Sequence, residues 1–503
     1  MLFQDKPANY NLSYLALLLL IAVYLVIWIT FFPKYISTSD EYHYVYQAKA
    51  FAQGQLEVRQ LNLTAWVEEN FLPSQTSPGT SALMTPFLFL GNWKLVYFMP
   101  LICQLLVALL IAWVLKEDDR SPLFALLFLT YPVAVVFGRM LMSDMPNMLF
   151  FTGSLALFWV GARLPERPGM LFFSGVLAGL SLLFRHTNVL VLAPFFLSHV
   201  LRRRPGAGYL IVGGMLGCLP RFAYYWLVWG NPLHFESVPQ GFSFFRFYEH
   251  LAFYGLSFNF LLPGLPFLAF LYRGRYRGEL FAAVLIYFLF YCFFEGGAPA
   301  TGFKKRLILA NRYMLPLAPL FIWAAAEPLS RWAALLRANY RRTLAVALVI
   351  LVIPYWVVLL HQHEAWSAER AQVRQIIYAN TLPGSIIIHN SENTRKYLLP
   401  FGEPRHQYCW REIQERDLLN AQEHGVPVFT AFVRRGDRSW FQACLREFLA
   451  HLTAVSELRP IKTAKVGEET LEISRVEKTW APLKPVAREE CYSTTPPLSW
   501  SPD

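Results

Sequence analysis

The amino-acid sequence predicts a polytopic α-helical membrane protein with about eleven transmembrane helices and a small C-terminal α/β domain. Two features of the composition favour this fold class: 55% of the 503 residues are hydrophobic and only 16% are charged. Soluble proteins carry about 45–50% apolar and about 25% charged residues. A third observation is the distribution: long uncharged runs occur up to residue 360, and none long enough to span a bilayer follows.

The uncharged runs have the length that a membrane requires. A hydrocarbon core of about 30 Å needs roughly 20 helical residues at a rise of 1.5 Å each. Positions 12–32 and 95–115 each hold 21 residues without a charged side chain. The first run exceeds the ~7–15 residues of a signal-peptide core, so we expect it to be retained. Further uncharged runs lie at 121–138, 145–162, 169–184, 187–201, 251–272, 280–294 and 343–360. Two more candidates, 207–229 and 313–330, each contain a single ionisable residue.

Lysine and arginine in the short connections predict the orientation of these helices. Basic or mixed segments follow every second span, at 116–120, 163–169, 202–206, 272–278 and 331–342. Because such loops stay on the cytoplasmic side, we expect a cytoplasmic N-terminus. The expected location is a bacterial inner (plasma) membrane. The net charge of +11 is then largely a topology signal, and no nucleic-acid partner is expected.

Two domains are expected. Residues 1–364 form the transmembrane domain, whose first outer loop (33–93) carries interfacial helices, among them a short one at 80–91. Residues 365–503 form an extracytoplasmic α/β domain with a disordered tail. Its expected strands are 384–390, 427–433 and 470–476, and its expected helices are 411–424 and 440–452. Cys409, Cys444 and Cys491 lie in this domain, where one disulfide could form and leave a free thiol; the sequence assigns no pairing.

Carboxylates gather at the predicted outer ends of the helices. Asp40 and Glu41 lie just past the first span, and Asp144 lies in the turn before the span at 145–162. Ionisable groups at membrane depth are costly, so they are candidate functional residues. The alternative is that these acids are solvated or cap the next helix, as the sequence "SDMPN" around Asp144 would allow.

Cations on the same predicted side run against the orientation rule. Arg185 occupies a very short outer turn, Arg221 interrupts the span at 207–229, and Lys304, Lys305 and Arg312 lie in the last large outer loop. Together they suggest a site for an anionic lipid headgroup, held by charge-assisted hydrogen bonds. The alternative is that Arg221 extends to the interface along its own stem and that the lysines form a solvated loop face.

Four elements in this order resemble the GT-C superfamily of polytopic glycosyltransferases. The likeness is to the branch with protein O-mannosyltransferases, the lipid A aminoarabinose transferase, and family 39 and Rgt-like bacterial enzymes. The elements are "SDEYHYVYQAKAFAQGQL", "TSPGTSALMTPFLFLG" (76–91), "RMLMSDMPNMLF" and "NRYMLPLAPL" (311–320). The resemblance as a whole covers most of the first 320 residues. The chain departs from the family at "SPG", where Pro-Pro is common.

The resemblance implies a polyprenyl-phosphate sugar donor, an inverting transfer on the extracytoplasmic face, and a lipid, glycan or protein acceptor. It implies that Asp40 is the catalytic base and that Arg312 contacts the donor phosphate. No cofactor is expected, although Asp40, Glu41 and Asp144 would also suit a shared divalent cation.

The residues fit this chemistry. A phosphate leaving group needs positive charge to stabilise it, and the attacking hydroxyl needs a base. Glu41 would orient Asp40 or bind sugar hydroxyls, and Asp144 would be a second acid. The other phosphate-binding candidates are Lys304, Lys305, Arg221 and Arg185, and the candidates that line the sugar or acceptor are Tyr42, Tyr44, Trp66 and Tyr313.

Other membrane functions compete with this interpretation. A secondary transporter would be expected to show inverted repeats and charges near the bilayer centre. A lipid-handling scaffold without transferase activity, or a protein like the O-antigen ligases, is the remaining alternative. Such ligases carry a large outer loop between late spans, whereas here the acid pair comes in the first loop.

Overall fold

A computed structural model describes residues 8–71, 77–164, 166–234, 241–294, 303–335, 338–390, 397–398, 405–435, 439–467 and 469–483. The chain divides into two compact units, each of which is described by itself. Unit 1 comprises residues 1–32 and 75–364, and unit 2 comprises 33–74 and 365–503. One division falls at 364, and the expected domain boundary remains a prediction. The structure differs at 33–74, which groups with the C-terminal residues and not with the transmembrane helices.

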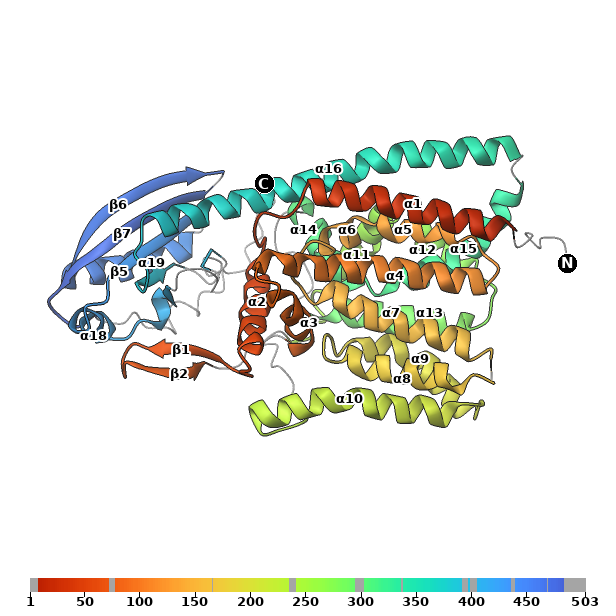
Figure 1. Cartoon of the computed structure of the whole chain (residues 1–503), viewed down its shortest axis with the longest axis horizontal. Helices are drawn as coiled ribbons and strands as arrows, with labels where there is room; N and C mark the ends of the chain where they lie inside the picture. Colours follow the sequence, from red (N-terminus) through yellow and green to blue (C-terminus); the bar gives the residue numbers. More distant parts are fainter. Residues whose placement is uncertain are drawn as a thin grey trace. The chain divides into compact units, whose positions relative to one another are not determined.

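Unit 1 is built from helices that lie alongside one another (Figure 1). Its longer helices are α1 (Ala8–Thr30), α4 (Phe98–Glu117), α7 (Asp144–Gly161), α8 (Pro168–Ser181), α9 (Asn188–Leu201), α10 (Ala207–Trp229), α11 (Phe247–Leu261), α13 (Arg277–Phe293), α15 (Leu317–Leu335) and the part of α16 (Ala338–Ala379) up to residue 364. Shorter helices are α3 (Pro78–Leu88), α5 (Leu126–Leu129), α6 (Pro132–Phe137), α12 (Leu265–Phe270) and α14 (Phe303–Ala310). Each predicted span coincides with one helix or with a broken series, and α3 is the short helix expected at 80–91.

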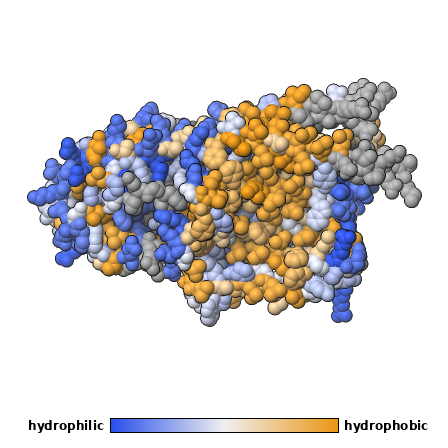
Figure 2. Space-filling model, in the orientation of Figure 1, coloured by the Kyte–Doolittle hydropathy of each residue, from blue (hydrophilic) through white to orange (hydrophobic). Residues whose placement is uncertain are grey.

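The outside of unit 1 is apolar, as Figure 2 shows for the visible face. Within the described residues, three helices are long and apolar enough to cross a membrane. A fourth span results if the pair 307–314 and 317–335, bent by 76°, is counted as one. The helices α8 and α9 are apolar but shorter. These features agree with an integral membrane protein, while the count of eleven spans remains a prediction.

Proline and glycine break three of the predicted spans. Residues 251–272 form α11 and α12, which are separated by Pro263 and Gly264, with Gly264 at a φ of 71°. Residues 121–138 form a 3-10 turn followed by α5 and α6, and Pro132 begins α6. The third broken span is 313–330, where α15 begins only at Leu317, after Pro316. Proline lacks the backbone donor that a continuous helix needs, and glycine readily adopts a positive φ.

The basic turns meet at one end of unit 1. Arg163, after α7, pairs with Asp118 at the end of α4. Arg275, before α13, donates from Nη2 to the Ala162 carbonyl at 3.0 Å. The turns after α4, after α7 and before α13 therefore share one end, as their alternation along the sequence predicts. The side of the membrane on which this end lies remains a prediction.

The helices α8 and α10 approach one another backbone to backbone. A Cβ atom added at Gly213 would lie 2.0 Å from the Phe172 carbonyl oxygen, and one at Gly217 would lie 2.2 Å from the Val176 oxygen. Only glycine fits at such distances. Small residues allow this close packing in membranes, where apolar surface provides little driving force between helices.

Unit 2 combines α2 (Ser39–Ala52), a hairpin of β1 (Val58–Asn62) and β2 (Val67–Phe71), and a mixed five-stranded sheet. The strand order is β4-β3-β5-β7-β6. Strand β3 is parallel to β4 and β5, whereas β7 is antiparallel to β5 and β6. The strands are β3 (Ile386–His389), β4 (His406–Cys409), β5 (Val428–Arg435), β6 (Ser456–Val466) and β7 (Glu469–Thr479), and the helices are α18 (Asp417–Glu423) and α19 (Ser439–Val455).

The structure contains the three predicted strands as β3, β5 and β7, and α18 and α19 lie within or close to the predicted helices. The edge strands β4 and β6 were not expected. Strand β4 has only four residues, and β6 contains Pro460 and is mostly exposed, so neither shows the alternation of a half-buried strand. Of the cysteines considered for a disulfide, Cys409 is buried in β4. Cys491 and the side chain of Cys444 lie outside the described residues.

Residues on both faces of the sheet are buried. Ile386 and Ile388 of β3 pack in one core with Leu452 of α19, and Ile387 packs in a second core with Ile377 of α16. This two-sided burial explains the continuous apolar run "SIIIH", which parallel central strands typically show.

Candidate functional site

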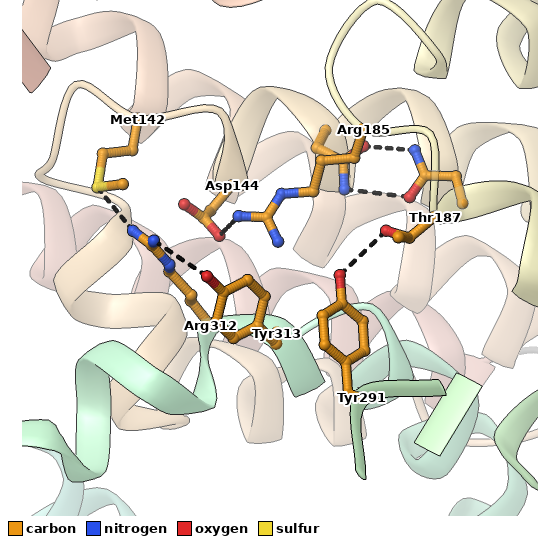
Figure 3. Close-up of polar contacts among 9 residues, drawn as sticks. Met142, Asp144, Arg185, Thr187, Tyr291, Arg312 and Tyr313 are labelled. Atoms are coloured by element: carbon orange, nitrogen blue, oxygen red, sulfur yellow. Dashed lines mark hydrogen bonds and ion pairs between the residues drawn. The ribbon is translucent and has the colours of Figure 1, made fainter. Parts of the chain in front are cut away.

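A buried ion pair marks one end of unit 1. Asp144 is the first residue of α7, and its Oδ1 lies 2.5 Å from Nη2 of Arg185 (Figure 3). The side chain of Asp144 is 1% exposed and that of Arg185 is 13% exposed. A buried charge is costly unless it is paired, so Arg185 is what stabilises this carboxylate. The other oxygen, Oδ2, is buried and has no hydrogen-bond partner among the described residues.

A second guanidinium lies beside this pair. Arg312 belongs to a 3-10 turn (Asn311–Met314), immediately before the bend that precedes α15. Its Nη2 donates to Oη of Tyr313 at 3.3 Å, and its Nη1 lies 3.7 Å from Sδ of Met142. The guanidinium carbons of Arg312 and Arg185 lie 5.2 and 5.6 Å from the centre of the Tyr313 ring. Both are within the range of cation–π attraction.

Tyr291, near the end of α13, ties the cluster together. Its ring stacks on Tyr313 with centroids 4.9 Å apart and an angle of 29°. Its hydroxyl lies 3.1 Å from Oγ1 of Thr187, two residues after Arg185. Figure 3 shows Tyr313 between Arg312 and Tyr291, below the Asp144 carboxylate in this view. The cluster thus joins α7, the turn before α9, α13 and the turn before α15.

Two buried asparagines fix the turn that carries Arg185. Nδ2 of Asn188 donates to Oδ1 of Asn147 at 2.5 Å and to the Ser181 carbonyl at 3.2 Å. Asn147 lies three residues after Asp144 on α7. These bonds hold the start of α9 against the start of α7, so Arg185 and Asp144 are kept within reach of one another.

Arg221 lies on α10 in a neighbouring network. Its Nε donates to Nε2 of His186 at 3.1 Å, and its Nη2 donates to the His234 carbonyl at 3.3 Å. Burial and, next, the charge of Arg221 lower the pKa of His186 from 6.5 to about 4. His186 is therefore neutral at pH 7 and accepts from Arg221. These contacts tie Arg221 to the residue that follows Arg185.

Lys304 and Lys305 belong to α14 by their backbone. Their side chains lie outside the described part of the structure, so their expected contact with phosphate remains a prediction.

The acid pair of the first loop lies in unit 2, at the start of α2. Oε2 of Glu41 accepts hydrogen bonds from the backbone nitrogens of Ser37 at 2.6 Å and Thr38 at 2.8 Å. Glu41 is fully buried and caps the helix. Asp40 lies in the first helical turn, where the helix dipole favours a negative charge.

The aromatic candidates of unit 2 pack within that unit. Tyr42 and Tyr44 are buried, and the Tyr42 hydroxyl accepts from Nε2 of Gln407 in β4. The Trp66 ring stacks on His424 with centroids 4.1 Å apart and an angle of 15°. Their expected role as a sugar-binding wall remains a prediction.

The chain is similar to known proteins in its three-dimensional structure. No protein-family model and no curated protein matches the chain. Among solved structures it is similar to ArnT from Cupriavidus metallidurans in the apo state, with a TM-score of 0.60 and 16% identity. That similarity covers 91% of this chain and 97% of the other. The chain has the GT-C fold.

A second GT-C structure is also similar. It is the oligosaccharyltransferase of Archaeoglobus fulgidus in the apo form, with a TM-score of 0.50 and 10% identity, covering 84% of this chain and 69% of that one. The fold expected from the four short motifs is thereby confirmed.

The structure brings together four of the predicted site residues. Asp144 pairs with Arg185, and the guanidiniums of Arg185 and Arg312 both lie near the Tyr313 ring. Sequence reasoning missed Met142, Asn147, Thr187, Asn188 and Tyr291. For Thr187 and Asn188 a signal was present, because they are polar and follow Arg185 directly in an otherwise apolar region. No such signal marked Tyr291, because it is one of several aromatic residues in its helix.

Metal ligands do not gather in the described part of this GT-C chain. No group of three or more histidine, cysteine, aspartate or glutamate side chains there is placed to hold an ion. A shared divalent cation therefore remains a prediction.

Proposed function

We propose that this chain is an integral-membrane glycosyltransferase. It moves a sugar from a polyprenyl-phosphate donor to a hydroxyl of a lipid, glycan or protein acceptor, on the extracytoplasmic face and with inversion. The observation that carries the proposal is the buried Asp144–Arg185 pair beside Arg312, in a chain with the GT-C fold. The two similar structures, an ArnT and an oligosaccharyltransferase, support transfer of lipid-linked sugar in general terms.

The cations suit the leaving group of this reaction. The bond between the anomeric carbon and the phosphate oxygen breaks, and the lipid phosphate leaves with an additional negative charge. Arg312 and Arg185 would bind that phosphate, because guanidinium groups match its geometry and stay charged. Asp144 would hold Arg185 in place and offer its second oxygen to a sugar hydroxyl. Arg221, Lys304 and Lys305 are assigned supporting roles in phosphate binding.

The acceptor needs a base. As its oxygen forms the new bond to the anomeric carbon, its hydroxyl proton must be removed, and a carboxylate can accept it. We assign this role to Asp40, which the helix start at α2 presents, while Glu41 stabilises that start through its capping bonds. Tyr42, Tyr44 and Trp66 would stiffen this part of unit 2 or line the sugar.

Asp40→Asn tests the proposal. The purified variant should insert into membranes and bind polyprenyl-phosphate sugar as the wild type does, yet transfer no sugar. Asp119→Asn, at an exposed turn of unit 1, is the matched control and should transfer normally. Mass spectrometry of the cell envelope with and without the chain identifies the product. Normal transfer by Asp40→Asn would refute Asp40 as the base. A cell envelope that is the same with and without the chain would refute the proposed transferase activity.

A further inference from the structure

A second polar cluster lies at the end of unit 1 that carries the basic turns. It is centred on Tyr276, just before α13. The guanidinium carbon of Arg275 lies 4.9 Å from the centre of the Tyr276 ring, and that of Arg204 lies 5.8 Å from it. Hydrophilic residues gather at this end of the apolar surface in Figure 2. The cluster is remote from Asp144, which begins the helix that ends here.

The two cations of this cluster lack a carboxylate partner. Two arginines near them are paired: Arg163 with Asp118, and Arg202 with Glu279 at 3.6 Å. Among the described residues, Arg204 and Arg275 form no ion pair. They converge from two different turns on one aromatic ring, so the cluster has an excess of positive charge that an anion would neutralise.

Two buried polar atoms at the cluster are also unsatisfied. Oη of Tyr276 and Nδ1 of His199 have no hydrogen-bond partner in the described part of the chain, although these residues are only 6% and 2% exposed. Both rings contact Phe158, with centroids 5.6 and 5.4 Å away. Unsatisfied buried polar groups cost about 1–3 kcal/mol each, so a ligand that bonded to these two atoms would remove that cost.

The chemistry of these atoms specifies the ligand. Nε2 of His199 lies 3.1 Å from the Pro205 carbonyl, which can only accept, so Nε2 carries the proton and Nδ1 is an acceptor. The Tyr276 hydroxyl can donate to an anion. The site thus offers two guanidiniums and one hydroxyl to an anionic oxygen, and one acceptor to a hydroxyl group.

The backbone here is also held in an unfavourable conformation. Tyr276 has a φ of 66°, and Arg203, beside Arg204, has a φ of 48°. Residues other than glycine rarely adopt such angles, which cost about 1–3 kcal/mol and occur preferentially at functional sites. The turns that supply both cations are therefore held in shape by their surroundings.

We propose that this cluster binds the phosphate of an anionic phospholipid headgroup. Arg204, Arg275 and the Tyr276 hydroxyl bind the phosphate oxygens, and Nδ1 of His199 accepts from a headgroup hydroxyl. The source is a lipid and not free phosphate because exposed apolar side chains adjoin both turns: Leu201 is 76% exposed and Phe270 is 57% exposed, which suits acyl chains. This inference does not depend on the proposed transferase activity.

The test uses the full chain purified in an uncharged detergent. Phosphatidylglycerol should raise the melting temperature more than phosphatidylcholine does at the same concentration. The double variant Arg204→Ala/Arg275→Ala should lose this preference, with affinity for phosphatidylglycerol falling about tenfold or more, as expected for lost charged hydrogen bonds. Arg277→Ala is the matched control, because Arg277 begins α13 two residues after Arg275 and its guanidinium carbon lies 5.6 Å from the centre of the Phe281 ring. It should keep the preference.

A second variant protects the test if the double variant does not fold. Tyr276→Phe removes only the unsatisfied hydroxyl, so the melting temperature without lipid should not fall, while the phosphatidylglycerol shift should shrink. An equal shift with phosphatidylcholine would overturn the proposal, as would a preference retained by both variants. A full shift produced by inorganic phosphate alone would overturn the lipid as the ligand.

Discussion

Asp144 and Arg185 form an ion pair although 41 residues separate them in the sequence. The pair joins the start of α7 to the turn before α9, inside a unit whose outer surface is apolar. Taking two charges out of water costs free energy that their attraction only partly offsets. A buried pair is therefore weak evidence for stability, and its presence here is better explained by the ligand that we propose for this cluster.

Replacing one partner of this pair should destabilise the protein more than replacing both. Arg185→Leu leaves the Asp144 carboxylate buried without a counter-charge, and we expect a loss of about 3–5 kcal/mol. The double variant Arg185→Leu/Asp144→Leu should recover most of that stability but no sugar transfer. Unfolding in detergent and a transfer assay measure the two effects. A double variant that transfers sugar normally would contradict the role of the pair.

Arg312 should contribute to donor binding. Arg312→Ala should weaken the binding of a polyprenyl-phosphate sugar by about tenfold or more, because hydrogen bonds to charged groups contribute about 1.5–3 kcal/mol. Arg312→Lys should recover part of the affinity, since lysine keeps the charge but not the planar fork. Arg246→Ala, at an exposed position before α11, is the control. Unchanged donor affinity in Arg312→Ala would exclude Arg312 from the phosphate site.

His186 should make stability depend on pH. Its folded pKa is lowered to about 4 from 6.5, by burial first and by Arg221 next. As the pH falls, the unfolded chain binds this proton first, so the contribution is complete above about 6.5 and is lost towards 4. The melting temperature of the wild type should fall through this range relative to that of His186→Gln, which keeps an acceptor but does not titrate. Parallel curves for the two proteins would show that His186 does not titrate as described.

The α8–α10 contact should tolerate no side chain at its glycines. Gly217→Ala forces a Cβ to 2.2 Å from the Val176 carbonyl oxygen, so the helices must separate at a cost of about 1–3 kcal/mol. Gly208→Ala is the control on the same helix, because a Cβ there meets no atom within 4 Å. Thermal unfolding of both variants measures the difference. Equal melting temperatures would mean that the helices are not packed this closely.

Hydropathy located the helices well but not their breaks. The runs at 145–162 and 207–229 are the continuous helices α7 and α10, whereas 251–272 is divided at Pro263 and Gly264. Composition averages over a window, and a single proline or glycine changes it little. In unit 2, β3 and β5 were found because burial on both faces leaves an apolar run. The edge strands β4 and β6 leave no such pattern.

The candidate site was only partly accessible to the same reasoning. Asp144, Arg185 and Arg312 stood out because charge is rare in apolar surroundings, and each is conspicuous locally. Glu41 was conspicuous in the same way, yet its bonds to Ser37 and Thr38 make it a helix cap.

The sequence by itself determined the class of fold, the approximate helix positions and the charged candidate residues. Each of these depends on properties of residues that are neighbours in the chain. Which residue each charged side chain contacts could not be predicted from the sequence. Arg312 meets Met142 across 170 positions, and Tyr291 reaches Thr187 across 104. Such pairings arise from how the apolar helices pack, and the bend before Leu317 lies directly after Arg312. Packing depends on shape over the whole unit, which no local pattern encodes.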